Sequence, residues 1–190
     1  QRFPMALDTE KPVMPVLMRI TGEAKPYSEE KEDLVRLVGF FKSWFRERYR
    51  QIFLQVDRSF LLFLMQPMEE EQAEIDLKQE LELFLSKAVL ASGGRMSLAL
   101  ADTWTDWTVL AAKIRMMREK LENGPEDDED YVCQLDPQAD VMAELIRTGD
   151  NLVHLMQQCE EDGIRQRIQE SFALAQQLEI SYSEFMYEMF

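Results

Sequence analysis

Apolar side chains recur at three- and four-residue steps along most of this chain, and this periodicity constrains the fold more than any other feature. It is cleanest in Met96, Leu100, Trp104, Trp107, Ala111, Ile114, Met117 and Leu121. Side chains at that spacing share one face of an α-helix. No stretch shows a convincing two-residue alternation. The sequence therefore predicts an all-α fold, a single-domain bundle or irregular array of five to seven helices.

Prolines, glycines and capping residues mark where these helices begin and end. The expected helices cover residues 28–66, 68–92, 96–123, 136–159, 164–178 and 181–190. Ser28 fits an N-cap, and Ser181 with Glu184 fits a capping box. A straight helix over 28–66 would be roughly 58 Å long. Because that exceeds the size of such a domain, we expect a bend or break near residues 57–59.

Residues 1–27 contain four of the seven prolines, and the fixed φ and missing amide of proline argue against a helix there. Residues 13–20 are mostly apolar, so this segment is expected to be an extended arm on a surface, or a strand or peptide that pairs with a partner. The helical domain then covers residues 28–190. Within it, residues 125–135 are expected to be an exposed loop, because Glu126 to Asp130 are five consecutive acids.

The charge is uneven along the chain. The net charge is −15, with +2 on residues 1–66 and −17 on residues 67–190. A surface this acidic repels nucleic acid and anionic lipid, so neither is expected as a partner of the C-terminal two thirds. Solubility explains the charge most simply, and a basic partner or nucleic-acid mimicry are the alternatives. No apolar run is long enough for a membrane-spanning helix.

The two cysteines, Cys133 and Cys159, are too few for a disulfide framework. They are expected to be reduced thiols, although a single bridge between them stays open. An intracellular location, cytoplasmic or nuclear, is therefore favoured over secretion. The chain begins at Gln1 without a leader, which leaves open whether it is part of a longer protein.

No residue set carries recognisable catalytic or cofactor chemistry. His154 is the only histidine, and five residues separate it from Cys159, so the two do not face each other on a helix. Zinc, di-iron, calcium and nucleotide motifs are absent. Asp102 and Asp106 would share a helix face as an acid–base pair or, more simply, as a solvated edge. The sequence therefore predicts a protein that is not an enzyme and that has no metal and no cofactor.

Residues 40–50 form the one segment that is both basic and aromatic, and its candidate binding residues are Trp44, Arg46, Arg48 and Arg50. Such a segment suits RNA, a phosphopeptide or calmodulin. The favoured alternative is a core helix whose arginines pair with the acidic C-terminal region. At the end of the chain, the apolar residues Phe185, Met189 and Phe190 are expected to dock within the molecule or on a partner.

The stretch 136–159 begins with Asp136-Pro137, and within it Val141, Leu145 and Leu152 lie on one helical face around Gly149-Asp150. This pattern resembles the short death motif of the B-cell-lymphoma family of apoptosis regulators. The resemblance implies that Val141, Leu145 and Leu152 fill a groove, that Gly149 permits close approach, and that Asp150 pairs with a groove arginine. The Asn-Trp-Gly-Arg run of that family is absent.

Together these features predict a non-enzymatic protein–protein interaction domain: an adaptor, a chaperone-like protein or a regulatory subunit of a larger complex. Its partner would be a helix or a basic surface of another protein. The alternatives are a secreted helical-bundle signalling protein and a groove binder that acts through residues 141–152. The partner's identity and the oligomeric state stay open.

Overall fold

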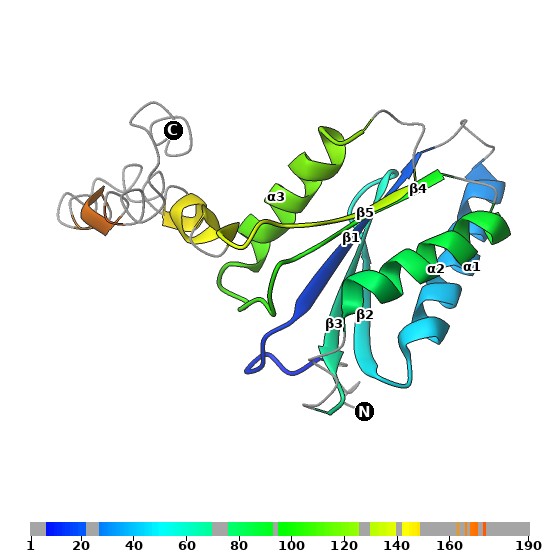
Figure 1. Ribbon diagram of the computed structural model, residues 1–190, viewed down its shortest axis with the longest axis horizontal. Helices are drawn as coiled ribbons and strands as arrows, with labels where there is room; N and C mark the ends of the chain where they lie inside the picture. The colour runs from blue at the N-terminus through cyan, green and yellow to red at the C-terminus, as the bar shows by residue number, and fades with distance from the viewer. Residues whose placement is uncertain are drawn as a thin grey trace.

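The computed structural model describes residues 7–21, 27–69, 76–92, 95–125, 130–139 and 142–148, together with 163, 166, 168–170 and 173. Over these residues the chain is an α/β structure in which helices pack on a five-stranded mixed sheet (Figure 1). The prediction of an all-α helical bundle is therefore wrong.

The elements follow one another as β1 (Met14–Thr21), α1 (Tyr27–Phe45), β2 (Tyr49–Gln55), β3 (Phe60–Pro67), α2 (Leu77–Ser92), β4 (Arg95–Leu100), α3 (Leu110–Glu122) and β5 (Tyr131–Gln134). The strand order in the sheet is β2-β3-β1-β4-β5. Neighbouring strands are antiparallel except β4 and β5, which are parallel. The first six elements form a split β-α-β arrangement, which α3 and β5 extend.

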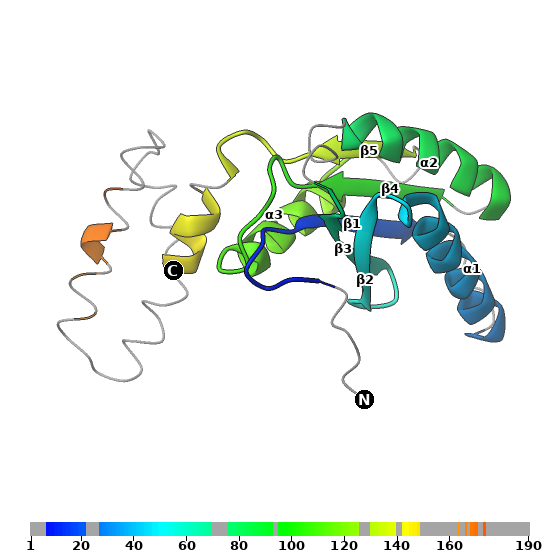
Figure 2. The same ribbon diagram turned by 90° about the horizontal axis from the view of Figure 1, so that it is seen from below.

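Helices cover both faces of the sheet, with α1 and α2 on one side and α3 on the other (Figures 1 and 2). The first core joins α1 and α2 to alternate strand residues such as Val16, Phe63 and Leu98. The second joins α3 to the intervening ones, such as Leu62 and Ala99. Strands buried on both faces are apolar throughout, without a two-residue alternation. This is why the sequence showed no strand signal.

The long helix expected over 28–66 is in fact α1 followed by a β2–β3 hairpin. The break expected at residues 57–59 is the turn of that hairpin, where the Asp57 carboxylate accepts hydrogen bonds from the amides of Ser59 and Phe60 at 2.8 and 3.0 Å. The run from Phe60 to Met65 matched a helical stripe only because every residue in it is apolar. The six side chains are all buried, three on each face of the sheet.

Two other predicted boundaries also need correction. The helix expected over 96–123 is β4, a loop and then α3, which begins only at Leu110. The acidic loop expected at 125–135 contains β5, so its second half lies in the sheet beside β4. The described part of the stretch 136–159 is helical at residue 139 and over 142–148. Ala143 and Ile146 there pack against Ala112 of α3.

The expected surface arm contains β1, the central strand of the sheet. Pro15 lies at the end of the β1–β4 ladder, where its carbonyl accepts a hydrogen bond from the amide of Ala101 at 3.4 Å. Proline has no amide to return that bond. The Ala101 carbonyl is bound instead by the side-chain amide of Gln134, at 3.4 Å. A proline is tolerated inside the sheet because β5 supplies the missing donor.

Gly39 lies in the interior of α1, is exposed, and has open space where a side chain would begin. We expect Gly39→Ala to raise the free energy of unfolding by about 0.5–1 kcal/mol, because alanine restricts the unfolded chain and suits a helix better. Urea denaturation measures the change. Ser43→Ala, four residues later on the same exposed side, should give a smaller gain. A loss of stability in Gly39→Ala would mean that something covers this face of α1.

Candidate functional site

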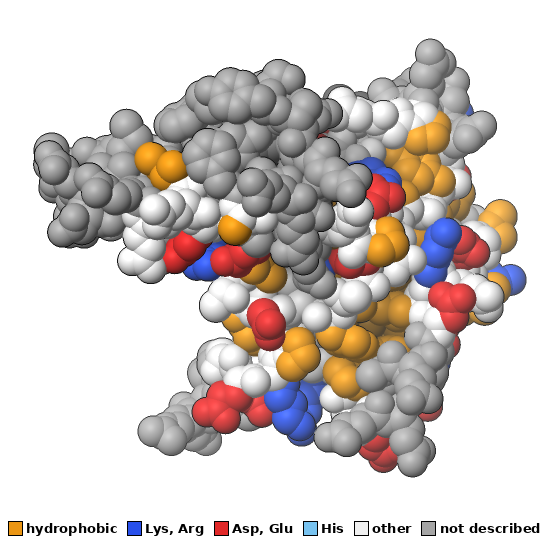
Figure 3. Space-filling model, turned by 60° about the vertical axis from the view of Figure 1, so that its left-hand side comes forward, with side chains coloured by type: hydrophobic (Ala, Val, Ile, Leu, Met, Phe, Trp, Pro, Cys, Tyr) orange, Lys and Arg blue, Asp and Glu red, His pale blue; other side chains and the backbone are white. Residues whose placement is uncertain are grey.

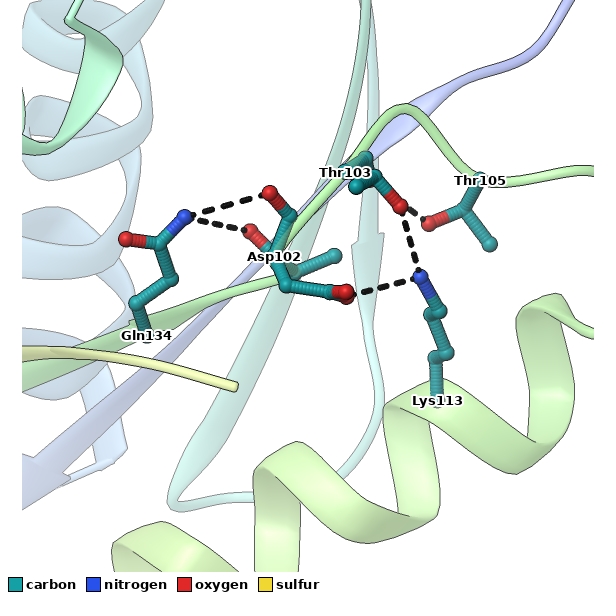
Figure 4. Close-up of polar contacts among 6 residues, drawn as sticks. Asp102, Thr103, Thr105, Lys113 and Gln134 are labelled. Carbon is teal, nitrogen blue, oxygen red and sulfur yellow. Dashed lines mark hydrogen bonds and ion pairs between the residues drawn. The ribbon is translucent and has the colours of Figure 1, made fainter. Parts of the chain in front are cut away.

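The most deeply buried charged group of the described chain is Lys113 of α3. Its side chain is fully buried, and its Nζ lies 2.8 Å from Oδ1 of Asp102, whose side chain is 5% exposed (Figure 4). Lys113 also donates a hydrogen bond of 3.2 Å to Oγ1 of Thr103. Asp102 and Asp106 do not share a helix face, because both belong to the loop between β4 and α3, where Asp106 is exposed.

This loop is held from three sides. Thr105 exchanges two backbone hydrogen bonds with Val13, at 2.8 and 2.9 Å, before β1 begins. The Gln134 side chain, from the end of β5, donates to the carbonyl of Asp102 at 3.3 Å. Lys113 binds the loop from α3. The amine faces a carboxylate and a hydroxyl inside the protein, so the pair fastens the loop to the helix and is not presented to a substrate.

A shallow hollow of about 460 Å³ lies beside the β2–β3 turn and is lined by Arg19, Asp57, Arg58, Ser59, Phe60, Arg118 and Glu122. The Arg118 guanidinium lies 2.8 Å from Glu122, 3.1 Å from Asp57, and 4.7 Å from the centre of the Phe60 ring. Its hydrogen bond to Glu122 raises the pKa of Arg118. Because the carboxylates of Asp57 and Glu122 both pair with the Arg118 guanidinium, this guanidinium is not available to bind an anion in the hollow.

The four candidate residues of the basic segment do not form one surface. Trp44 packs edge-on against Phe40 and Phe84, with ring centres 5.7 and 6.1 Å apart, and so joins α1 to α2. Arg48 forms an ion pair with Glu80 of α2, which is a contact with the acidic part of the chain. Arg46 and Arg50 are exposed, and Arg46 lies 3.9 Å from Glu47.

Two side chains, Tyr49 beside the Arg48–Glu80 pair and Cys133 on β5, have altered acidity. Burial raises the pKa of the Tyr49 hydroxyl, Glu80 raises it further, and Arg48 opposes the shift. On β5, Cys133 is a half-buried free thiol, and burial raises its pKa too. Since the thiolate is the reactive form, Cys133 is not an activated nucleophile.

The remaining predicted binding residues come from the C-terminal part of the chain. Leu145 is fully buried, so this structure does not display it to a groove. The others lie outside the described residues: Val141, Gly149, Asp150, Leu152, Phe185, Met189 and Phe190. His154 and Cys159 are also outside them.

A surface that the sequence analysis missed is the outer edge of β2, which among the described residues is the last strand on one side of the sheet and has no neighbouring strand beyond it. Val56 donates a hydrogen bond to Phe60 at 3.0 Å, and Arg48 accepts one from Met68 at 2.9 Å. Bonds alternate along an antiparallel ladder, so the even-numbered residues of β2 bond to β3. The N–H and C=O groups of Gln51, Phe53 and Gln55 therefore point away from the sheet.

Two apolar side chains lie exposed beside these outward groups. Leu54 is 48% exposed and Val56 44%, and they continue the row of Ile52, which packs into the core on the α3 side. Figure 3, which looks toward that side of the sheet, shows hydrophobic side chains at the surface among charged groups of both signs. A sequence signal was present: residues 51–56 are six consecutive uncharged residues without proline or glycine.

Among the described residues, no three His, Cys, Asp or Glu side chains gather as a metal site would require. None of the helices in the described ranges is both long and apolar enough to cross a membrane. Comparison with family models, with curated proteins and with solved structures gives no match to this chain.

Proposed function

We propose that this chain is a protein-binding domain that adds an extended segment of a partner to the free edge of β2. The observation that carries the proposal is the outward row of backbone groups on Gln51, Phe53 and Gln55, next to the exposed Leu54 and Val56. An added strand gains affinity from main-chain hydrogen bonds and selectivity from the side chains beside them. The domain would act without catalysis, as an adaptor or regulatory subunit.

The composition of this edge supports the proposal. Exposed edges in natural proteins are normally blocked by charge, proline, a bulge or a covering segment. Between Arg50 and Asp57 the strand has none of the charged or proline devices. Short uncharged segments of strand-forming residues associate readily when left open. A chain that keeps such an edge exposed is best explained by a partner that covers it.

The test is site-specific photocrosslinking in cells that express the full chain. We expect a benzophenone amino acid at position 54 to crosslink to a polypeptide, and the same probe at position 90 to give none. Leu90 is the matched control, because it is 82% exposed on α2, away from the edge.

Gln55→Pro should abolish the crosslink, because it removes an outward amide and leaves the bonds from β2 to β3 in place. Gln55→Ala, which keeps that amide, should not abolish it. Equal crosslinking from positions 54 and 90, or crosslinking that survives in Gln55→Pro, would contradict the proposal.

A further inference from the structure

We infer that the segment which pairs with β2 is β2 of a second copy of this chain, antiparallel, with Phe53 on the two-fold axis. The inference rests on the proposed function of this edge and names the partner. A two-fold interface uses the same surface on both subunits, so that surface must complement itself. The β2 edge meets this condition in its side chains, in its hydrogen-bonding groups and in its charge.

The side chains are nearly symmetric about Phe53. The strand reads Gln51-Ile52-Phe53-Leu54-Gln55, which is almost the same in both directions. Antiparallel pairing centred on Phe53 puts Gln51 opposite Gln55 of the second copy, and Ile52 opposite its Leu54. Amide then meets amide, aliphatic meets aliphatic, and the two Phe53 rings are neighbours. Matched apolar and aromatic pairs of this kind stabilise neighbouring strands.

The hydrogen-bonding groups fit the same register. The outward N–H and C=O groups belong to Gln51, Phe53 and Gln55. Pairing centred on Phe53 sets these residues opposite one another, as an antiparallel ladder requires. A shift by one residue sets each outward group opposite a residue already bonded to β3. That register cannot form the ladder.

Shifts by two residues form hydrogen bonds but fit less well. The first of these registers is centred on Ile52 and puts Arg50 of each copy opposite Leu54 of the other. It also needs the Tyr49 carbonyl, which already accepts a hydrogen bond from the Gln51 side chain at 3.5 Å. The other leaves only residues 53–55 of β2 within the pairing, because the strand ends at Gln55. The register centred on Phe53 pairs five residues and covers Ile52 and Leu54 in both copies.

The charge of this region favours the approach of a second copy. Two chains of net charge −15 repel each other over most of their surfaces. No acidic residue occurs from Arg48 to Val56. The β2 edge therefore brings two copies together where like-charge repulsion between carboxylates is smallest. Of the two arginines in this stretch, Arg48 repels the second copy less than Arg50 does, because the Arg48 guanidinium is already paired with Glu80.

Contacts with neighbouring residues fix the side chains of Gln51 and Phe53 on one face of the β2 edge. On the α1 side, the Gln51 side chain donates to the Lys42 carbonyl at 3.3 Å. The Lys42 amine lies 5.9 Å from the centre of the Phe53 ring, and that ring packs on Phe63 with centres 5.5 Å apart. On the α3 side, Leu54 and Val56 stay exposed. Pairing joins both sheets into one and places Leu54 of each copy beside Ile52 of the other.

The first experiment measures the mass of the purified full chain by analytical ultracentrifugation over a dilution series. We expect a reversible dimer, weakened about a hundredfold in Leu54→Lys, because the substitution acts at two symmetric places and each tenfold corresponds to about 1.4 kcal/mol. Leu90→Lys should dimerise as the unchanged chain does. Circular dichroism establishes that both variants keep the fold.

The second experiment tests the register by disulfide crosslinking and mass spectrometry of the linked peptides. Mixing the Gln51→Cys and Gln55→Cys chains should give a crosslink between positions 51 and 55, and neither chain alone should link through its new cysteine. Crosslinks in a different register would overturn the inference, as would a dimer that Leu54→Lys does not weaken.

A folded monomer at every concentration also overturns the inference. In that case a crosslink from position 54 to a different polypeptide would leave the proposed function standing. A monomer with no crosslink from position 54 would remove both.

Discussion

Replacing Lys113 by methionine is expected to lower the free energy of unfolding by about 3–5 kcal/mol, the usual cost of removing one partner from a buried ion pair. Methionine keeps most of the side-chain volume, so the loss comes chiefly from the Asp102 carboxylate. Oδ1 of Asp102 loses its partner at 2.8 Å. Oδ2 already has no hydrogen-bond partner among the described residues. Urea denaturation of both proteins measures the difference.

Two controls separate the buried charge from other effects. Lys120→Met makes the same change on the same helix, where Lys120 lies 3.3 Å from an Asp136 side chain that is 86% exposed, and we expect a loss of less than about 1 kcal/mol. The double variant Lys113→Met/Asp102→Leu removes both charges and should recover much of the loss. A double variant no more stable than Lys113→Met alone would show that the cost is one of packing.

Replacing Phe41 by alanine is expected to cost about 3–5 kcal/mol, because a large ring leaves a core that cannot close over the space. Phe41 is fully buried at the centre of the first core. Its ring stacks on Phe63 of β3, with centres 3.8 Å apart, and touches Phe84 of α2, with centres 5.1 Å apart. One side chain thus joins α1 to both the sheet and α2.

Thermal and urea denaturation measure this loss, and Val35→Ala on the same helix is its control. Val35 is 64% exposed, so its truncation should change stability by no more than about 0.5 kcal/mol. Equal losses in the two variants would mean that α1 does not pack on the sheet through its Phe41 face. The pair therefore tests the α/β fold itself, which differs from the fold predicted by periodicity.

The sequence predicted the helices better than the strands. Leu37, Phe41 and Phe45 are spaced four residues apart within the helix expected over 28–66, and they form the buried face of α1. Gly93-Gly94 follows directly on the last residue of α2, and the break expected near residues 57–59 is a true turn. These features depend on neighbouring residues, so local chemistry was enough to predict them.

The strands could not be distinguished in this way. Phe60 to Met65 is apolar at every position, and such a run fits a helix as well as a strand buried on both sides. Pro15 argued against a helix, and the sequence left open a surface arm or a strand that pairs with a partner. The segment instead contains the central strand of this chain's own sheet, where Gln134 binds the carbonyl that proline leaves without a donor. Gln134 is far along the chain, so no local pattern could show it.

The candidate surface depends even more on tertiary structure. Residues 51–56 are visibly uncharged in the sequence, but their meaning depends on whether β2 lies inside the sheet or at its edge. Strand order is set by how α1 and α2 cross over the sheet, and periodicity carries no information about it. The ion pair of Lys113 and Asp102 likewise exists only because the loop after β4 folds back onto α3.

By itself the sequence determined the charge of the protein, the apolar face of α1 and the C-terminal ends of α2 and α3, because these depend on residue type and short spacings. Only the tertiary structure decided that the apolar runs are strands, that the proline-containing segment is central, and that β2, within the part of the chain that is described, has a neighbouring strand on one side only. Burial on both faces removes the alternation by which a strand is recognised, and the edge of a sheet exists only once all its strands have been placed.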